Sequence, residues 1–218
     1  MRIFSLDNRL SLCACFVREK AVLADIGTDH AYLPVWLVTN GIIDKAIACD
    51  INEGPLKAGQ ADVQKYGLSD KIELRLSDGL VGVQENECDD IVIAGMGGEL
   101  ISRIIGDCSW AKNKDKHFIL QPMTKPEVLT QFLYKNGFEI IEQKACECDN
   151  KHYTVMLVEY TGVITQADIS QYYLGKLDTQ DESSRLYLSH IISHLSKRAI
   201  GDPTLKGVIE KIKGAINL

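Results

Sequence analysis

Short apolar runs alternate with amphipathic stretches between residues 21 and 160. The runs are typical of strands, and the stretches between them repeat apolar residues every three or four positions, as one face of a helix does. Strands that alternate with helices favour a parallel sheet covered on both faces, and nearly all-apolar strands agree with such burial. The predicted strands are 21–25, 46–50, 72–76, 90–94 and 118–120, and the predicted helices are 31–40, 54–66, 98–106 and 125–136.

The end of this block has a different pattern. Two β-rich runs, 138–146 and 152–160, are separated only by the polar segment 147–151. Because no helix intervenes, the two runs predict an antiparallel hairpin at the end of the sheet.

Beyond residue 160 the strand pattern stops. Apolar residues with helical spacing recur over 183–199 and 204–216, and Gly201-Asp202-Pro203 breaks the pattern between them. Asp202 is suited to cap the second helix and Pro203 to occupy its first position. We therefore expect an antiparallel, coiled-coil-like pair of helices, and a division of the chain into a sheet domain, 1–162, and a helical domain, 163–218.

The charge is unevenly distributed along an otherwise ordinary globular composition. Of the 218 residues, 45% are hydrophobic and 25% are charged, and the formal net charge is −6. From Arg185 onward, six bases stand against two acids, a balance of +4, so the rest of the chain carries −10. This asymmetry allows a local basic surface on an acidic body.

Neither a membrane span nor a metal site is predicted. No apolar run approaches the roughly 20 residues that cross a bilayer, and residues 1–7 lack the apolar core of a signal peptide, so we expect a cytoplasmic protein without a membrane partner. The seven cysteines are an odd number, and the Cys-x-Cys pairs at 13/15 and 146/148 miss the usual metal-site spacing. His190 and His194 lie one helical turn apart, but the sequence offers no third ligand.

Acidic residues and glycines gather where the predicted strands end. Four successive strands lead into the segments 25–30 (DIGTDH), 50–52 (DIN), 77–79 (SDG) and 94–98 (AGMGG). Ligands of open α/β sheets bind at the carboxyl ends of the strands, so we expect one binding site here.

Each acid in these segments is suited to a nucleoside ligand that carries an ammonium group. Gly27 permits a sharp turn and a close approach of the backbone, and Asp25 and Asp29 can accept from the ammonium group. Asp50 follows Asp25 by 25 residues, where an acid can accept from both ribose hydroxyls. Asp78 is placed to accept from the exocyclic amine of an adenine.

These strand ends favour S-adenosylmethionine over a dinucleotide. The full G-x-G-x-x-G fingerprint is missing, because Asp29 and Ala31 follow Gly27. An acid at this place would repel a diphosphate but suits a cationic ligand. Glycines at 95, 97 and 98 leave room for the methionine portion and an incoming base. The predicted fold is therefore an α/β, class I (Rossmann-like) methyltransferase sheet with an antiparallel last strand, followed by the helical hairpin.

Five motifs follow one another along the chain: ADIGTDHAYLP (24–34), DIN (50–52), SDGL (77–80), IAGMGGELI (93–101) and LQPM (120–123). The combination of ADIGTDHAYLP with IAGMGG is distinctive, whereas the other motifs are shared by many methyltransferases. Together the five resemble the motifs of the bacterial tRNA (adenine(22)-N1)-methyltransferases, and the resemblance extends from Asn8-Arg9-Leu10 to the C-terminal helical pair. It implies transfer of a methyl group from S-adenosylmethionine to N1 of an adenine in the D-arm region of tRNA. It also implies that residues 1–162 are catalytic and that the C-terminal helices help to hold the tRNA. We expect the protein to act as a monomer.

The resemblance places the methyl donor against the ends of the first four strands. Arg9 is added to this set because a guanidinium can clamp the donor carboxylate or a tRNA phosphate. The predicted donor-binding residues are Arg9, Asp25, Gly27, Asp29, His30, Asp50, Ile51, Asn52, Asp78, Gly79, Ala94, Gly95 and Met96.

The chemistry of the implied reaction selects the remaining candidates. N1 of adenine carries an in-plane lone pair and no proton, so the enzyme must mainly extrude the base, align N1 with the methyl–sulfur bond and exclude water. The predicted catalytic residues are Asp29, His30 and Tyr32: Tyr32 would stack on the base, His30 would hydrogen-bond it, and a carboxylate would stabilise the charge on the ring. We expect Gln121-Pro122-Met123 near the substrate entrance.

Two alternatives stay open at this point. One is a class I methyltransferase that acts on another nucleobase, a protein or a small molecule. The other is a non-catalytic module that binds the donor or RNA. Methylation of an exocyclic adenine amine is disfavoured, because 94–97 reads Ala-Gly-Met-Gly where such enzymes carry Asn/Asp-Pro-Pro-aromatic.

Overall fold

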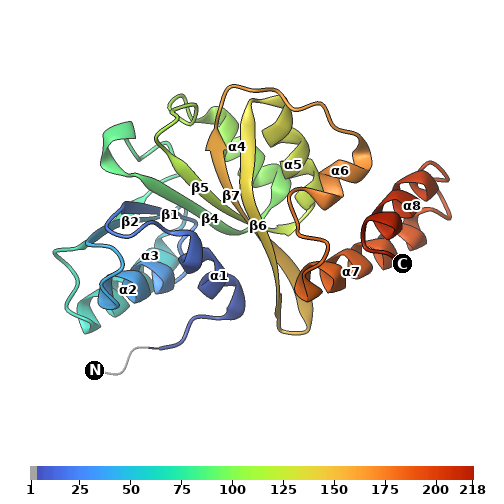
Figure 1. Ribbon diagram of the computed structural model, residues 1–218. Helices are drawn as coiled ribbons and strands as arrows, with labels where there is room; N and C mark the ends of the chain where they lie inside the picture. Colours follow the sequence, from blue (N-terminus) through green and yellow to red (C-terminus); the bar gives the residue numbers. More distant parts are fainter. Residues whose placement is uncertain (1–3) are drawn as a thin grey trace.

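The computed structural model describes residues 4–218 and is built on one seven-stranded mixed sheet (Figure 1). Its strands are β1 (Val22–Ile26), β2 (Lys45–Asp50), β3 (Ile72–Leu76), β4 (Asp90–Gly97), β5 (His117–Thr124), β6 (Phe138–Cys148) and β7 (Lys151–Tyr160). They lie in the order β3-β2-β1-β4-β5-β7-β6, in which β1 to β5 pair in parallel and β7 runs antiparallel to both of its neighbours. The predicted class I methyltransferase architecture is confirmed; the first three residues of the predicted sheet domain lie outside the described residues.

Helices cover both faces of this sheet, as the strand pattern predicted. On one face lie α1 (Asn8–Phe16), α2 (Tyr32–Thr39) and α3 (Glu53–Lys65), and on the other lie α4 (Gly98–Asp107) and α5 (Pro126–Lys135); a short 3₁₀ turn, η1 (Glu85–Glu87), precedes β4. Alternation along β4 shows why both layers are needed. Ile91 and Ile93 pack into one hydrophobic cluster and Val92 into the other, because successive side chains of a strand point to opposite faces.

The hairpin between β6 and β7 is tighter than predicted. The loop contains only Asp149 and Asn150, with φ of 51° and 57°, instead of the five residues 147–151. Two successive left-handed residues form the two-residue hairpin turn that matches the twist of the strands, and Asp and Asn tolerate this conformation better than most residues. The longer strands bring the tip of the hairpin to the start of α1, where Asn8 Nδ2 donates to the Glu147 carbonyl at 2.7 Å.

The C-terminal region consists of α6 (Ile169–Leu174), α7 (Glu182–Arg198) and α8 (Leu205–Ala215), on the far side of β6 from α2 and α3 (Figure 1). It has its own hydrophobic cluster, in which Leu188, Leu195 and Ile212 are fully buried. The predicted pair of helices is present as α7 and α8. Asp202 accepts from the Thr204 amide at 3.1 Å, although α8 begins at Leu205, two residues after the predicted Pro203.

A buried glutamine joins this helical region to the sheet. Gln143 Oε1 accepts from the Lys176 amide at 2.8 Å, and Gln143 Nε2 donates to Thr154 Oγ1 at 2.9 Å. Gly175 lies against this side chain with φ of +55°, and a Cβ at this position would stand 2.2 Å from Gln143 Oε1. The close approach therefore requires glycine.

Two helices are absent from the predictions. In α1, which was treated as a short segment before the sheet, Asp7 caps the helix by accepting from the Leu10 amide at 2.8 Å. In α6, Asp168 forms a capping box with Gln171. α6 spans only six residues, which is too few for a helical pattern of apolar positions to repeat. Within residues 4–218, no helix has the length and apolar character needed to span a membrane.

Candidate active site

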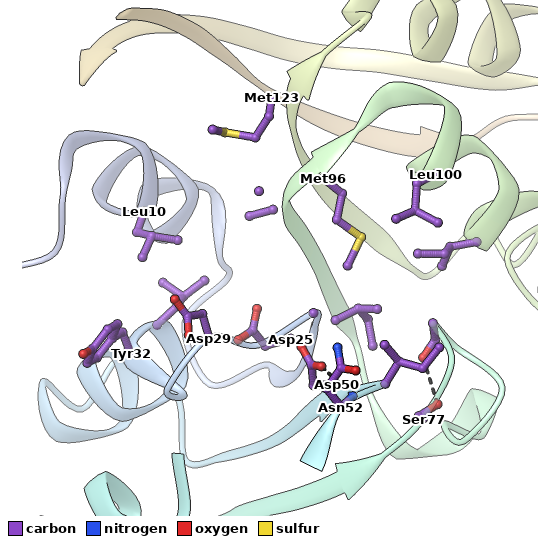
Figure 2. A pocket seen from close by; sticks show the side chains of 18 of the residues that line it. Leu10, Asp25, Asp29, Tyr32, Asp50, Asn52, Ser77, Met96, Leu100 and Met123 are labelled. Atoms are coloured by element: carbon purple, nitrogen blue, oxygen red, sulfur yellow. Dashed lines mark hydrogen bonds between the residues drawn. The ribbon is translucent and has the colours of Figure 1, made fainter. Parts of the chain in front are cut away.

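A cleft of about 590 Å³ opens at the carboxyl ends of β1 to β4, beneath the first turn of α1. Every predicted donor-binding residue except His30 lines it, and so does the predicted catalytic Tyr32. Figure 2 shows Asp25, Asp29 and Asp50 on one side of the cleft, and Met96 and Met123 on the other. Lining residues outside the predicted set are Asp7, Leu10, Ile26, Leu33, Ser77, Leu100, Arg103, Ile104 and Met123.

The turn after β1 is shaped by backbone conformation. Gly27 has φ of +78° and its amide donates to the Cys49 carbonyl of β2 at 2.8 Å; an added Cβ would meet Met96 Cε at 2.1 Å. His30 and Ala31 follow with φ of 56° and 54°, which is costly for residues other than glycine. Such strain is found where a site requires a fixed backbone, and here it leaves the Asp29 side chain 79% exposed beside the cleft.

Asp25 is a buried carboxylate at the floor of the cleft. Only 7% of the residue is exposed, and burial, with a smaller contribution from the nearby Asp50, raises the pKa of Asp25 to about 6. Among the ion pairs of residues 4–218, none offers a cation to this carboxylate. A ligand with an ammonium group would therefore find an acceptor that no protein cation occupies.

The ends of β2 and β3 hold two further acids. Asp50 Oδ1 accepts from the Asn52 amide at 2.8 Å, which fixes the carboxylate and leaves Oδ2 for a ligand. After β3, the hydroxyl of Ser77 accepts from the Gly82 amide at 2.8 Å and holds the turn that carries Asp78. Asp78 pairs with Arg103 of α4 at 3.0 Å across a half-exposed surface.

On the opposite side of the cleft, Gln121 connects three segments. Gln121 Oε1 accepts from the Gly95 amide at 3.1 Å and from Arg9 Nη1 at 3.0 Å, while its Nε2 donates to the Pro122 carbonyl. The residue is fully buried within β5. It thus fixes the turn at Gly95, where φ is +79°, and docks α1 onto the sheet. A glutamine at the end of the apolar run FIL was the signal that could have identified this role.

Arg9 lines the cleft but is held by internal partners. Its guanidinium bonds Gln121 and the Asp7 carboxylate, the latter at 2.8 Å, and lies 5.6 Å from the centre of the Tyr153 ring. These contacts favour a role in building the wall of the cleft. The predicted contact with a donor carboxylate or a phosphate would add to that role.

His30 does not line the cleft. Its ring stacks on that of Tyr32, with centroids 5.2 Å apart and planes 6° apart, and its Nε2 lies 3.4 Å from Asp29 Oδ1. Phe4 packs edge-on against Tyr32 at 5.1 Å. His30 therefore contacts two residues that line the cleft, Tyr32 and Asp29, without lining it itself.

The cysteines and histidines offer no additional chemistry in the cleft. All seven cysteines are free, and burial raises the pKa of Cys49 and Cys88 to about 12 and that of Cys146 to about 11. Thiols with such pKa values are not nucleophilic near neutral pH. Within the described part of the chain, no group of three or more His, Cys, Asp or Glu residues could hold a metal ion.

Comparisons with known proteins agree with this geometry. A family model described as a methyltransferase domain matches residues 6–156. The tRNA (adenine(22)-N(1))-methyltransferase of Bacillus subtilis is 38% identical over 159 residues, which are 73% of this chain and 67% of the relative. A tRNA (m1A22) methyltransferase candidate of Streptococcus pneumoniae, solved in complex with S-adenosyl-L-methionine, has a TM-score of 0.88 at 31% identity, over 97% of this chain and 100% of that one. TrmK of M. capricolum, solved with S-adenosyl-homocysteine, has a TM-score of 0.82 at 27% identity, over 98% and 99% of the two chains.

Proposed function

This chain belongs to the family of bacterial tRNA (adenine(22)-N1)-methyltransferases, and from that premise we propose that it transfers a methyl group from S-adenosylmethionine to N1 of adenine 22 in tRNA. The observation that carries the use of this donor is one cleft lined by a carboxylate from each of three adjacent strand ends, β1, β2 and β3. The tRNA target rests on the relatives.

The residues of the cleft fit the donor group by group. Buried Asp25 would accept from the ammonium of the methionine portion, and the free Oδ2 of Asp50 would accept from the ribose hydroxyls. Asp78 would accept from the exocyclic amine of the donor's adenine, and its ion pair with Arg103 would loosen when it does so. Ile51, which is 60% exposed, offers an apolar surface to the adenine ring.

Once bound, S-adenosylmethionine supplies an electrophilic methyl group on a sulfonium. The protein's task is then to position the acceptor, since adenine N1 needs no general base. Gly95 leaves open space, because a Cβ at this position would meet nothing within 4 Å. Tyr32, 37% exposed at the rim, would contact the extruded base, with the His30 ring stacked on that of Tyr32. Asp29 would accept from the exocyclic amine of the extruded tRNA adenine. It would also stabilise the positive charge that develops on this ring during methyl transfer.

We further propose that the enzyme acts as a cytoplasmic monomer without a metal ion. The cytoplasm is where a tRNA substrate is available, and attack by the N1 lone pair requires no Lewis acid. The catalytic residues would lie within 1–162, and the helical domain, 163–218, would contact the tRNA through its basic residues.

Methyl transfer from labelled S-adenosylmethionine to unmodified bacterial tRNA, followed by nucleoside analysis, tests the proposal. Label should appear in N1-methyladenosine, and a transcript with guanosine at position 22 should receive none. Label in another nucleoside, or equal labelling of the substituted transcript, would contradict the assignment of the target. If the protein does not bind S-adenosylmethionine in calorimetry, the assignment of this molecule as the methyl donor is contradicted.

A further inference from the structure

A second groove of about 660 Å³ lies between α7 and the junction of β5 with α5. We call it the α7 groove and define it by Lys125, His152, Tyr153, Tyr187, His190 and His194. Figure 1 shows α7 beside β6 and β7, which brings its histidines next to the hairpin. None of its defining residues lines the cleft described above.

The α7 groove adjoins the active-site cleft. Met123 lines both, so its side chain forms part of the partition between them. Tyr153 lines the groove, and Arg9, which lines the cleft, lies over the Tyr153 ring at 5.6 Å. Two neighbouring nucleotides of one RNA can therefore lie on either side of this partition, one in the cleft and one in the groove.

The surface of the groove suits a planar, uncharged ring with polar edges. Tyr153 and Tyr187 are 8% and 4% exposed and form its floor, and burial raises the pKa of Tyr187, so its hydroxyl stays neutral. The rings of His152 and His190 lie 5.9 Å apart on its wall, with His194 one turn further along α7. Histidine and tyrosine supply aromatic faces together with hydrogen-bond donors and acceptors.

The charges of the groove are already balanced. Lys125 Nζ pairs with Glu99 Oε1 at 2.7 Å. Arg198 and Glu127 both lie close enough to Tyr173 to influence its pKa, in opposite directions, although burial has the larger effect. A phosphate would therefore find no excess of positive charge here, which favours a nucleobase over the RNA backbone as the occupant.

We propose that the α7 groove binds a nucleobase of the same tRNA, unstacked beside the target adenine. The inference rests on the proposed function, because the target nucleotide must occupy the neighbouring cleft. Proteins that recognise unpaired RNA stack the splayed bases on Tyr and His side chains and hydrogen-bond their edges. A second bound base would offset part of the cost of extruding the first and would fix the register of the tRNA on the enzyme.

The double variant His190→Ala/His194→Ala tests this groove, with Ser193→Ala, an exposed neighbour on α7 that does not line it, as the control. Dissociation constants for a tRNA transcript are measured by fluorescence anisotropy, alongside a set of transcripts that each lack one base near position 22. Stacking energies predict that the double variant binds the intact tRNA about tenfold more weakly, with unchanged donor affinity. One abasic transcript should show the same loss with the wild type and no further loss with the double variant, because a shared contact is not lost twice.

Unchanged tRNA affinity in the double variant would overturn the inference. Additive losses at every abasic position would also overturn it, because they would mean that the histidines contact no particular base. These measurements do not require turnover. Absence of N1-methyladenosine with the wild type would therefore contradict the proposed function while the test of the groove still gives a result.

Discussion

The sheet domain and the C-terminal helices resemble known proteins in different ways. The methyltransferase family model ends at residue 156, within β7, whereas the solved structures superpose on 97% and 98% of the chain. The cleft needs particular residues, such as a glycine where φ is +78° and a carboxylate at the ends of β1, β2 and β3. The α7–α8 pair needs only an apolar stripe and a break. Substitutions should therefore have sharply local effects on binding in the first region and diffuse effects in the second.

The largest expected effect tests whether the two regions are separate folding units. Leu188→Ala removes a fully buried side chain from the helical cluster and should destabilise that region by about 2–5 kcal/mol. Hydrogen exchange should accelerate over 169–216 while donor affinity is retained. Leu23→Ala, at a fully buried position in the sheet domain, is the matched control and should accelerate exchange throughout that domain. Equal acceleration in β1 to β4 after Leu188→Ala would show that the regions unfold together.

Next in size is the loss of one carboxylate from the cleft. Asp50→Ala removes the proposed ribose acceptor, and hydrogen bonds to a charged group predict donor binding about tenfold to a hundredfold weaker. Calorimetry with S-adenosylmethionine measures this directly. Glu53→Ala, at an exposed acid nearby that pairs with Lys57, controls for the change in charge and should leave the affinity unchanged. If Asp50→Ala and the wild type bind S-adenosylmethionine equally well, Asp50 does not contact the donor.

A third test uses pH to address Asp25. Its pKa of about 6 lies above the ordinary value of 3.8, so the free folded protein binds this proton more tightly than the unfolded chain does. The stabilising contribution is fully present below pH 3.8 and is lost as pH rises through 6. Donor binding has the opposite trend, because the ammonium needs the ionised form: affinity should rise about tenfold from pH 5 to pH 7. In Asp25→Asn, donor affinity should no longer depend on pH over this range. If the pH dependence persists, the titrating group is a residue other than Asp25.

Most of the cleft could be predicted from the sequence because the position of its residues depends on the local strand or turn that carries them. An acid that ends a strand, such as Asp50, is placed by the strand itself, and glycines mark the turns. Arg103 was not predicted, and Gln121 was expected only near the substrate entrance, because their contacts depend on partners far along the chain. Arg103 of α4 meets Asp78, and Gln121 of β5 meets Arg9 of α1. His30 belongs to the right motif, but it has a left-handed backbone and its ring stacks on Tyr32 instead of lining the cleft. Such geometry follows from the fold rather than from local pattern.

The fold itself divides in the same way. The strands and long helices follow from periodicity, since each must bury a face. The short helices α1 and α6 depend on single capping residues, Asp7 and Asp168, which a pattern of apolar positions does not register. The α7 groove likewise arises only when α7 packs on β6 and β7 and faces the junction of β5 with α5, so no single segment of the sequence reveals it.

The smallest expected effect concerns the basic residues of α7 and α8, and it is the sharpest test of their diffuse role. Among residues 4–218, Lys197 and Lys206 have no acidic partner within an ion pair, whereas Lys211 pairs with Asp168 at 2.6 Å. Lys211 also holds the pKa of Asp168 well below its usual range. If the helices attract tRNA through phosphates, Lys197→Ala and Lys206→Ala should each weaken tRNA binding only about two- to threefold and reduce the salt dependence of binding by about one unit. Lys211→Ala should change tRNA affinity and its salt dependence less, because Asp168 already neutralises the charge of Lys211. Equal salt slopes for the three variants would mean that local pairing does not decide which lysines meet the tRNA, and a change in donor affinity would mean that the helices influence the cleft as well.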